Sequence, residues 1–402
     1  MGYAIKLSGA NPDCPSVIPS GVEGSLIVTV RDVSTSLDMT RVLIAPDKFK
    51  GSLTAREVAQ NIAKGLLDVL PEAKIDIVPM ADGGEGTAEV LCAALGGSWE
   101  NCPAHDPIDR EIEARYGWIA DQRLAVMEMS EAAGMRRLSE SERDPLRANT
   151  FGVGEMISAA AKRGAREMII GLGGSATNDG GFGMACALGF QFFAAKNAKL
   201  DGFKPSSLPA LERIEKPPGL QLPQIIAAVD VKNPLLGENG ATRVFGPQKG
   251  VTPDKIDILE AALGRLADVV AEEFGFDRRD TAGAGAAGGL GFGLISFCGA
   301  KIRPGFDVVA EAIDLESQMK DVDLVITGEG SLDRQTMEGK TPAGVARIAR
   351  KLGKRVFAIV GRASEDRQPR RMFDGVYELG GTIPEAAHLL QERARQLAKS
   401  LQ

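Results

Sequence analysis

The sequence predicts an α/β protein of two domains, in which a doubly wound parallel sheet carries an inserted α/β domain with a mixed sheet. Three observations lead to this prediction. Runs typical of strands and of helices alternate at both ends of the chain, which favours parallel strands joined by crossover helices. Between residues 98 and 129 the alternation changes to the pattern of an antiparallel hairpin. The length of 402 residues suffices for two or three domains.

Four elements are expected after residue 38, in the order strand, helix, strand, helix: residues 42–45, 54–70, 75–78 and 87–95. Apolar residues of the first helix recur at helical spacing, as Val58, Ile62, Leu66 and Val69. Thr54, followed three residues later by Glu57, is a capping box and marks the start of this helix. This order of elements predicts a parallel sheet.

The middle of the chain is expected to form a different sheet. Apolar and polar residues alternate over 112–118 and 124–126, with a turn at 120–122 between them, so these runs predict an antiparallel hairpin. The other elements expected in this region are strands at 168–170 and 225–229 and helices at 153–163, 181–189 and 253–274.

The last 80 or so residues return to the pattern of the start. The expected elements are strands at 323–327, 355–360 and 373–379 and helices at 342–352 and 384–401. We therefore assign residues 39–104 and 319–402 to one discontinuous domain with the doubly wound sheet. Residues 105–318 form the inserted domain.

Residues 1–38 differ in pattern from the rest and are expected to be an N-terminal extension. They lack the basic start and the long apolar region of a signal peptide. Met39 stands directly before a strong strand, so the working protein is expected to begin there. The alternative is that residues 25–30 form a genuine edge strand.

Charge and composition exclude several classes of function. The formal net charge is −7, and an acidic surface repels a nucleic-acid backbone. No apolar run approaches the roughly 18–20 residues that span a bilayer, so no membrane partner is expected. The five cysteines form no CxxC motif, which argues against a zinc cluster or a disulfide framework and fits a reducing cytoplasm. With only His105 and His388, a Ser-His-Asp triad has almost no histidine to draw on.

Glycine is in excess, with 48 of 402 residues, or about 12% against roughly 7% on average. Many glycines lie in polar clusters directly after predicted strands. Five strand ends carry such clusters with an Asp or Glu: residues 46–52, 79–87, 171–181, 230–234 and 327–333. Ligands of doubly wound sheets bind outside the carboxyl ends of the strands, so these clusters predict the ligand site.

The mixture of residues in these clusters favours phosphoryl transfer. Backbone N–H groups of glycine-rich turns hold phosphate oxygens, lysine neutralises moving charge, and carboxylates hold Mg²⁺ or deprotonate the accepting hydroxyl. The common nucleotide signatures are absent. Gly339-Lys340-Thr341 resembles the end of a P-loop, but Arg334 stands where its first glycine belongs. A G-x-G-x-x-G at 283–288 has no strand before it and is expected to begin a close-packed helix.

Six strings in order resemble the bacterial glycerate kinase family that uses neither a P-loop nor a protein-kinase fold. They are VLIAPDKFKGS from Val42, PMADGGEGT from Pro79, GLGGSATNDGG from Gly171, DVKNPLLG from Asp230, FGPQKG from Phe245 and GEGSLDRQTMEGK from Gly328. The resemblance runs from about residue 39 to the C-terminus. It implies one flavodoxin-like and one inserted α/β domain with the active site in the cleft. It also implies phosphorylation of D-glycerate by ATP and Mg²⁺ through direct in-line transfer, with 2-phosphoglycerate as the favoured product.

Roles for single residues follow as hypotheses. The catalytic candidates are Asp47, Lys50, Asp82 and Asp230, and the candidates for Mg²⁺ are Asp179 and Asp230. Contacts to substrate or phosphate are expected from Lys48, Ser52, Gly83, Gly84, Glu85, Gly173, Gly174, Ser175, Thr177, Asn233, Gly328, Glu329, Gly330, Asp333, Thr336 and Lys340. Ser52 is also expected to cap the helix that follows it. The substrate carboxylate needs a cation, for which Lys48 and Lys249 are both possibilities.

Other functions compete with this interpretation. A kinase for another small hydroxy acid or a triose would need the same chemistry at the strand ends. A metabolite-binding protein without catalysis has no need of so many carboxylates beside phosphate loops. An NAD-linked dehydrogenase is disfavoured by the missing dinucleotide fingerprint and the shortage of histidines.

Overall fold

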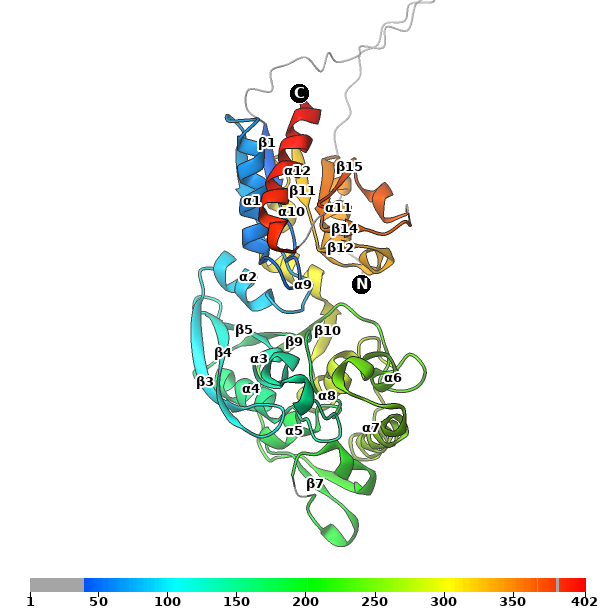
Figure 1. The fold of residues 1–402 in the computed structure, drawn as a ribbon. Coiled ribbons are helices and arrows are strands. Elements are labelled where there is room, and N and C mark those ends of the chain that lie inside the picture. The colour runs from blue at the N-terminus through cyan, green and yellow to red at the C-terminus, as the bar shows by residue number, and fades with distance from the viewer. Residues whose placement is uncertain (1–39, 201, 367, 381–382) are drawn as a thin grey trace, which may run out of the picture. The chain divides into compact units, whose positions relative to one another are not determined.

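A computed structural model describes residues 40–402 apart from 201, 367, 381 and 382, and it is organised around two sheets (Figure 1). The proposed start at residue 39 and the alternative strand at 25–30 lie outside the described residues. The two-domain α/β class predicted from the sequence is confirmed, with one parallel and one mixed sheet.

The first sheet consists of five parallel strands. They are β1 (Arg41–Ile44), β2 (Lys74–Ile77), β11 (Leu324–Thr327), β13 (Arg355–Val360) and β15 (Gly375–Glu378). Their spatial order is β15-β13-β11-β1-β2, which is the order of flavodoxin-like sheets. The direction of winding reverses between β1 and β11. In sheets of this kind the ligand binds at that switch point.

Helices cover both faces of the first sheet because successive side chains of its strands point to opposite faces. On one face, Val42 and Ile44 pack with α1 (Ala55–Leu67) and α12 (Ala386–Leu401), which lie side by side (Figure 1). On the other, Leu43 packs with α9 (Gly305–Ala312), α10 (Leu315–Gln318) and α11 (Thr341–Lys351). The capping box of α1 is confirmed: the Thr54 hydroxyl accepts from the Glu57 backbone, and Glu57 accepts from the Thr54 backbone.

The second sheet is mixed, with the order β10-β9-β6-β5-β4-β3. Its strands are β3 (Ser98–His105), β4 (Glu111–Ile119), β5 (Leu124–Glu128), β6 (Glu167–Gly171), β9 (Gln224–Val229) and β10 (Lys301–Pro304). The predicted hairpin is confirmed as β4 and β5, and the pairs from β5 to β10 are parallel.

Strand β3 was not predicted, because it is an edge strand with Asn101 and Pro103 in its sequence, and proline is depleted in sheets. It pairs with β4 along its whole length. A domain boundary after residue 104 therefore cuts an antiparallel pair. The limits of the two domains remain a proposal, and we move this boundary to a position before Ser98.

The second sheet is accompanied by seven α-helices among the described residues. They are α2 (Thr87–Ala94), α3 (Ser130–Ala133), α4 (Phe151–Arg163), α5 (Phe182–Ala187), α6 (Ala241–Phe245), α7 (Pro253–Phe274) and α8 (Ala286–Cys298). Helix α7 has the predicted limits. The glycine-rich start of α8 is closely packed, as predicted: a Cβ on Gly285 would lie 2.1 Å from the Pro234 carbonyl oxygen, and one on Gly288 would lie 1.9 Å from that of Thr177.

The remaining elements are short. Two-stranded pairs form between β7 (Gln191–Phe193) and β8 (Arg213–Glu215) and between β12 (Ser331–Leu332) and β14 (Arg362–Ala363). The 3₁₀ turns are Met135–Arg137, Glu140–Glu142, Ala195–Asn197, Pro205–Ala210, Pro247–Lys249, Arg334–Glu338, Pro369–Met372 and Ile383–Glu385.

One hydrophobic cluster joins the two sheets. In β5, Leu124 and Val126 belong to this cluster, whereas Ala125 and Met127 point into the core of the second domain. The same cluster contains Phe306 of α9, together with residues of β1, β11 and β13 from the first sheet. The two sheets therefore share buried apolar surface.

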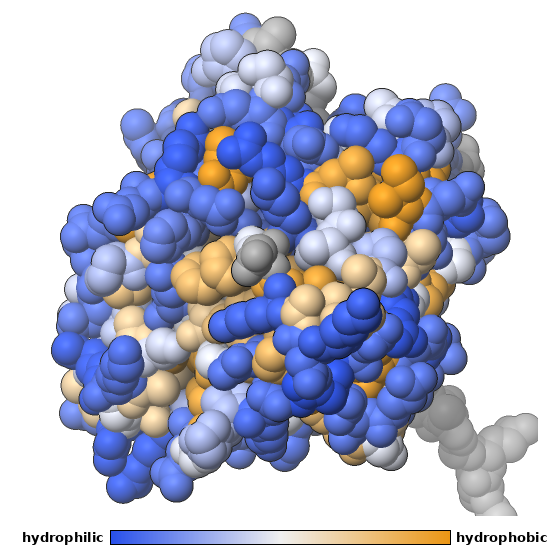
Figure 2. Space-filling model, turned by 90° about the horizontal axis from the view of Figure 1, so that it is seen from below, coloured by the Kyte–Doolittle hydropathy of each residue, from blue (hydrophilic) through white to orange (hydrophobic). Residues whose placement is uncertain are grey.

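Among the described residues, no helix is both long enough and apolar enough to cross a membrane. On the face shown in Figure 2, hydrophobic residues form small separate groups among hydrophilic ones.

Candidate active site

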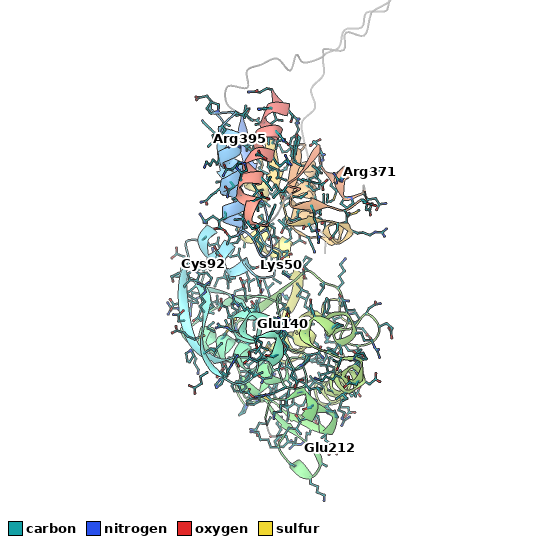
Figure 3. All side chains as sticks on the ribbon, viewed as in Figure 1. Lys50, Cys92, Glu140, Glu212, Arg371 and Arg395 are labelled. Atoms are coloured by element: carbon teal, nitrogen blue, oxygen red, sulfur yellow. The ribbon has the colours of Figure 1, made fainter. Side chains whose placement is uncertain are left out.

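A cavity of about 620 Å³ opens at the switch point of the first sheet, between the loops that follow β1 and β11. The first loop contributes Asp47, Lys48, Lys50 and Ser52, and the second contributes Glu329, Gly330, Asp333 and Lys340. Asp82, from the loop after β2, completes the acidic lining. Lys50 is exposed and lies at the end of the first sheet (Figure 3). We call this space the switch-point cavity. It brings together nine of the residues predicted from the sequence.

Asp47 is the most perturbed carboxylate of the switch-point cavity. It is 8% exposed, and its Oδ2 accepts a hydrogen bond of 2.6 Å from the Thr341 hydroxyl at the start of α11. Its Oδ1 accepts one of 2.7 Å from the Lys48 backbone. Burial and the neighbouring Asp82 raise the pKa of Asp47 to about 7. The group can therefore take up or release a proton near neutral pH.

Glu329 is a second perturbed carboxylate on the opposite loop. It is 8% exposed, and its Oε1 accepts a hydrogen bond of 2.5 Å from the Thr336 hydroxyl. Burial raises the pKa of Glu329 to about 7, while Thr336 and Lys340 favour the charged form. Thr336, predicted to contact substrate or phosphate, thus orients Glu329.

Asp230 follows β9 and brings the second sheet into the same electrostatic group. Its carboxylate is accessible to water but surrounded by protein, and this partial loss of hydration together with Asp82 raises its pKa to about 6. Lys340 and Lys48 oppose that rise. Asp82 itself is fixed by a hydrogen bond of 3.1 Å from the Gly84 backbone to its Oδ1. Residues far apart in the sequence thus interact at one centre.

The contacts of Lys48 and Ser52 differ in part from those predicted from the sequence. The Lys48 ammonium donates to the backbone carbonyl of Glu85 and so joins the loops after β1 and β2. The residue that caps α1 is Thr54, so the capping role predicted for Ser52 is wrong. Both Lys48 and Ser52 nevertheless line the switch-point cavity.

The glycines after β2 and β6 bring backbones together. A Cβ on Gly173 would lie 2.6 Å from the Gly84 Cα, and one on Gly83 would lie 2.9 Å from the Gly305 Cα. A Cβ on Gly305 would lie 1.8 Å from the Asp82 carbonyl oxygen. Such distances admit no side chain. These glycines therefore hold the loop that carries Asp82 against the second sheet.

Gly328 and Gly174, which were predicted to contact substrate or phosphate, also lie where a side chain would meet neighbouring atoms. Gly328 passes the backbone of β13, where a Cβ would lie 2.3 Å from the Ile359 carbonyl oxygen. Gly174 adopts a φ of +70° and faces the Glu85 carboxylate, 2.6 Å from where its Cβ would be. Glu85 thus lies against the loop after β6.

Ser175, Thr177 and Lys249 form a buried group inside the second domain. The Lys249 ammonium donates to the Ser175 hydroxyl at 2.6 Å and to the Thr177 carbonyl oxygen at 2.8 Å. Lys249 is 1% exposed, and burial lowers its pKa to about 7. These contacts fix the loop after β6. They do not place Lys249 or the two hydroxyl residues in the lining of the switch-point cavity.

Asp179 has a structural environment that corrects its predicted role as a Mg²⁺ ligand. It is fully buried, and its carboxylate accepts hydrogen bonds from the Thr150 hydroxyl and from the backbones of Thr150, Gly181 and Gly183. These four donors occupy both oxygens and hold the starts of α4 and α5. Asn233 likewise holds a turn, since its amide donates to the Asn239 carbonyl oxygen at 2.8 Å. Neither residue lines the switch-point cavity.

Three residues in or near the candidate site were not among those predicted from the sequence. Thr341, which orients Asp47, follows Lys340 in the string that resembled a P-loop end, and that string was the available signal. Arg362 lines the switch-point cavity from β14. Glu128 accepts from the backbones of Gly86 and Ala88 and so holds the start of α2, 40 residues away, where no local pattern points to it.

Comparison with known proteins extends these observations. The sequence profile of the glycerate kinase family matches residues 42–402. The chain is 43% identical over 329 residues to the glycerate 2-kinase of Escherichia coli (strain K12), which covers 81% of this chain and 86% of that protein. It is 40% identical over 366 residues to the glycerate kinase of Halalkalibacterium halodurans, which covers 90% and 94%.

A solved structure shows the same fold. The crystal structure from Salmonella typhimurium LT2 that was assigned as glycerate kinase 2 superimposes with a TM-score of 0.80 at 40% identity, over 90% of this chain and 98% of that chain. The profile match spans every loop of the switch-point cavity. The chain therefore belongs to the glycerate kinase family and is a kinase.

Proposed function

We propose that the protein transfers the γ-phosphoryl group of ATP to the 2-hydroxyl of D-glycerate. The observation that carries this proposal is a group of four carboxylates and two lysines: Asp47, Asp82, Glu329, Lys48 and Lys340 line the switch-point cavity, and Asp230, after β9, interacts with them electrostatically. Groups of this composition neutralise the transferring phosphoryl group, bind a divalent cation and accept a proton. The name of the Escherichia coli relative, glycerate 2-kinase, supports the choice of hydroxyl.

Asp47 is the proposed acceptor of the hydroxyl proton. A general base works best with a pKa near the operating pH, and the pKa of Asp47 is about 7. As the glycerate oxygen bonds to the γ-phosphorus, the bond from that phosphorus to the bridging oxygen of ADP breaks. The hydroxyl proton passes to the Asp47 carboxylate, which Thr341 holds in place.

The lysines of the switch-point cavity supply positive charge. Lys340 interacts with both Glu329 and Asp230, so it can hold a phosphate oxygen between the two loops. Lys50 is exposed at the mouth and is the proposed contact to the phosphoryl group. Arg362, which the sequence prediction did not include, is well placed for the carboxylate of glycerate, because guanidinium groups bind carboxylates at two points.

Mg²⁺ is expected at Asp82 and Asp230. Loss of hydration, and after it the neighbouring Asp82, raises the pKa of Asp230, and a divalent cation would relieve the repulsion between the two carboxylates. Among the described residues, no group of three or more His, Cys, Asp or Glu gathers as a metal site. Two carboxylates plus substrate phosphates are an ordinary set of ligands for Mg²⁺. When bound, the ion would neutralise charge on the phosphate oxygens.

The test is an ADP-release assay with ATP, Mg²⁺ and D-glycerate, in which phosphorus NMR distinguishes the phosphoglycerates. The expected result is 2-phosphoglycerate in step with ADP. The 3-phospho isomer would retain the reaction but overturn the choice of hydroxyl. No ADP above the control without glycerate would refute the substrate. Asp121→Asn, on the exposed turn between β4 and β5, is the matched control for Asp47→Asn.

A further inference from the structure

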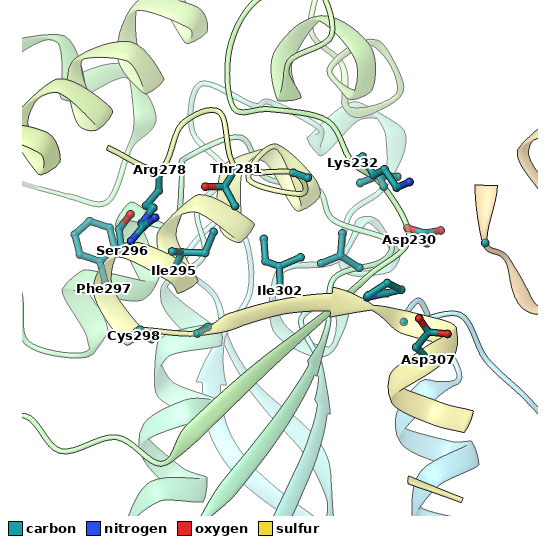
Figure 4. A pocket seen from close by; sticks show the side chains of 18 of the residues that line it. Asp230, Lys232, Arg278, Thr281, Ile295, Ser296, Phe297, Cys298, Ile302 and Asp307 are labelled. Atoms are coloured by element: carbon teal, nitrogen blue, oxygen red, sulfur yellow. The ribbon is translucent and has the colours of Figure 1, made fainter. Parts of the chain in front are cut away.

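A second cavity, of about 1200 Å³, adjoins the group of acids and lysines from the side of the second sheet. Figure 4 shows Arg278, Ser296 and Phe297 at one end of it, Asp230 and Asp307 at the other, and Ile302 between them. Because β10 and the end of α8 form much of its wall, we call it the β10 cavity. It leads from an end that carries apolar side chains together with Arg278 and Ser296 to the proposed catalytic centre.

The apolar end of the β10 cavity offers surface for a flat ring. Ile295 from α8 and Ile302 from β10 line it and are only half-buried, although both are large apolar residues. Pockets for small ligands combine such apolar surface with a few placed polar groups. Ser296 is one such group: it is 8% exposed, and its hydroxyl has no hydrogen-bond partner within the described part of the chain. A buried hydroxyl without a partner is costly, and a ring nitrogen of a ligand would satisfy it.

The β10 cavity differs from the two neighbouring cavities in the charge of its lining residues. It is lined by four basic and two acidic residues: Lys216, Lys232, Arg278 and Arg347 with Asp230 and Asp307. The switch-point cavity has four of each sign: Lys48, Lys50, Lys340 and Arg362 with Asp47, Asp82, Glu329 and Asp333. A third cavity, of about 480 Å³ beside α2, has two basic and four acidic residues: Lys48 and Arg56 with Asp47, Glu85, Glu89 and Asp314. A polyanion with an apolar end therefore fits the β10 cavity best.

We propose that the β10 cavity binds the base and ribose of the nucleoside triphosphate, with the Ser296 hydroxyl at the base and the phosphates extending past Asp230 to Lys340. This inference rests on the proposed function. Met337 and Gly339 line the β10 cavity, whereas Lys340 lines the switch-point cavity, so a short segment after β12 separates the two. Glycerate, which is much smaller than the nucleotide, then occupies the switch-point cavity.

Nucleotide binding and turnover are measured separately on the full chain. Titration calorimetry with ATP in the absence of glycerate gives the Kd, and the ADP-release assay gives KM for each substrate. Ile302→Trp places a bulky ring in the middle of the β10 cavity and is expected to weaken ATP binding at least about tenfold by steric clash. Ser296→Ala removes one hydrogen bond and is expected to weaken it about three- to tenfold. Both are expected to leave KM for glycerate within about twofold.

Two controls keep the inference open to refutation. Ala93→Trp places the same bulk in the acidic cavity beside α2, at an exposed residue, and is expected to leave the Kd for ATP unchanged. Ser296→Ala removes a hydroxyl that has no partner among the described residues, so its Tm is expected to equal or exceed that of the parent. This variant therefore tests the inference even where Ile302→Trp does not fold.

The outcomes separate this inference from the proposed function. ATP binding that weakens in both β10-cavity variants, with no phosphorylation of glycerate by the parent, would support the inference and refute the substrate. Phosphorylation of glycerate with unchanged ATP affinity in Ser296→Ala and Ile302→Trp would refute the inference and retain the function. A loss of ATP affinity in Ala93→Trp alone would assign the nucleotide to the acidic cavity.

Discussion

Asp47 combines two properties that oppose each other in a folded protein. Burial beside Asp82 disfavours its charged form, which lowers the stability of the native state at neutral pH. The same environment raises its pKa to about 7 and so makes it an effective proton acceptor. At this residue, function and stability are expected to change in opposite directions.

The first prediction is that Asp47→Asn lowers kcat and raises the Tm. Loss of a general base lowers kcat by about 10²–10⁴-fold. In the folded state the pKa is about 7, against an ordinary value of 3.8, so the folded state binds the proton more tightly than the unfolded state. Stability is therefore lost as pH rises from about 4 to 7. The gain in Tm of the variant should be larger at pH 8 than at pH 5.

Asp47→Asn, the parent and the control Asp121→Asn are compared by thermal denaturation at the two pH values and by steady-state kinetics. A gain in Tm that is the same at both pH values would show that Asp47 does not carry the pH dependence. Normal kcat in the variant would remove Asp47 from the catalytic machinery.

The second prediction concerns the pH dependence of the parent. We expect kcat/KM to fall below pH 7 because the base becomes protonated there. The pKa values of Glu329, about 7, and of Asp230, about 6, lie close by, so the acidic limb belongs to the interacting group. A profile that stays flat from pH 8 down to pH 5 would contradict a general base in this group.

The third prediction is that Gly305→Ala disrupts the position of Asp82. Its Cβ would lie 1.8 Å from the Asp82 carbonyl oxygen, so the backbone of one of the two loops must move. We expect kcat/KM to fall more than tenfold. Gly264→Ala is the control, since its Cβ would meet only the Leu236 side chain at 3.8 Å, and it should retain activity. Equal activity in the two variants would show that the close approach of the loops is not needed.

At the scale of elements, a helix or strand could be predicted where its own residues show a local apolar pattern. Helix α7 was predicted with its observed limits because its apolar residues repeat over 22 residues and Pro253 starts it. The strands of the first sheet were predicted because short runs rich in apolar residues alternate with helices. Strand β3 was not, because an edge strand with proline lacks that pattern.

Part of the candidate site could likewise be predicted from local sequence, and part could not. Loops at strand ends could be predicted to carry Asp47, Asp82 and Glu329, since topology places those ends together. The partners of buried groups could not be predicted from local patterns. Asp179 stands in a glycine-rich loop as a ligand might, yet four donors from its own domain surround it. Thr341 meets Asp47 across 294 positions of sequence.

The fourth prediction tests the capping box of α1. Thr54→Ala removes the hydroxyl that accepts from the Glu57 backbone, and we expect a loss of about 1 kcal/mol in the free energy of unfolding. Thr54→Ser retains the oxygen and should lose much less. The midpoints of urea denaturation compare the two variants with the parent. Equal midpoints for alanine and serine would show that the cap contributes nothing measurable.

At the scale of the whole molecule, the shared cluster predicts that both sheets unfold together. The two tryptophans of the chain, Trp99 and Trp118, both lie in the second sheet, so their fluorescence follows that sheet. Circular dichroism follows all helices. Because residues such as Phe306 belong to a core common to both sheets, we expect the two denaturation curves to coincide. Two separated transitions would show that the domains unfold independently.

The long separation between β1 and its neighbour β11 also determines the order in which a nascent chain can fold. The two strands meet through residues 282 positions apart, as in the hydrogen bond from the Arg41 backbone to Asp323. At about 5–20 residues per second, a ribosome needs about 14–56 s to make the intervening chain. All six strands of the second sheet emerge during that interval, whereas β1 waits with one edge unpaired. Asp47 and Glu329 can therefore meet only after residue 329 has been made, and we expect the growing chain to show no activity before then.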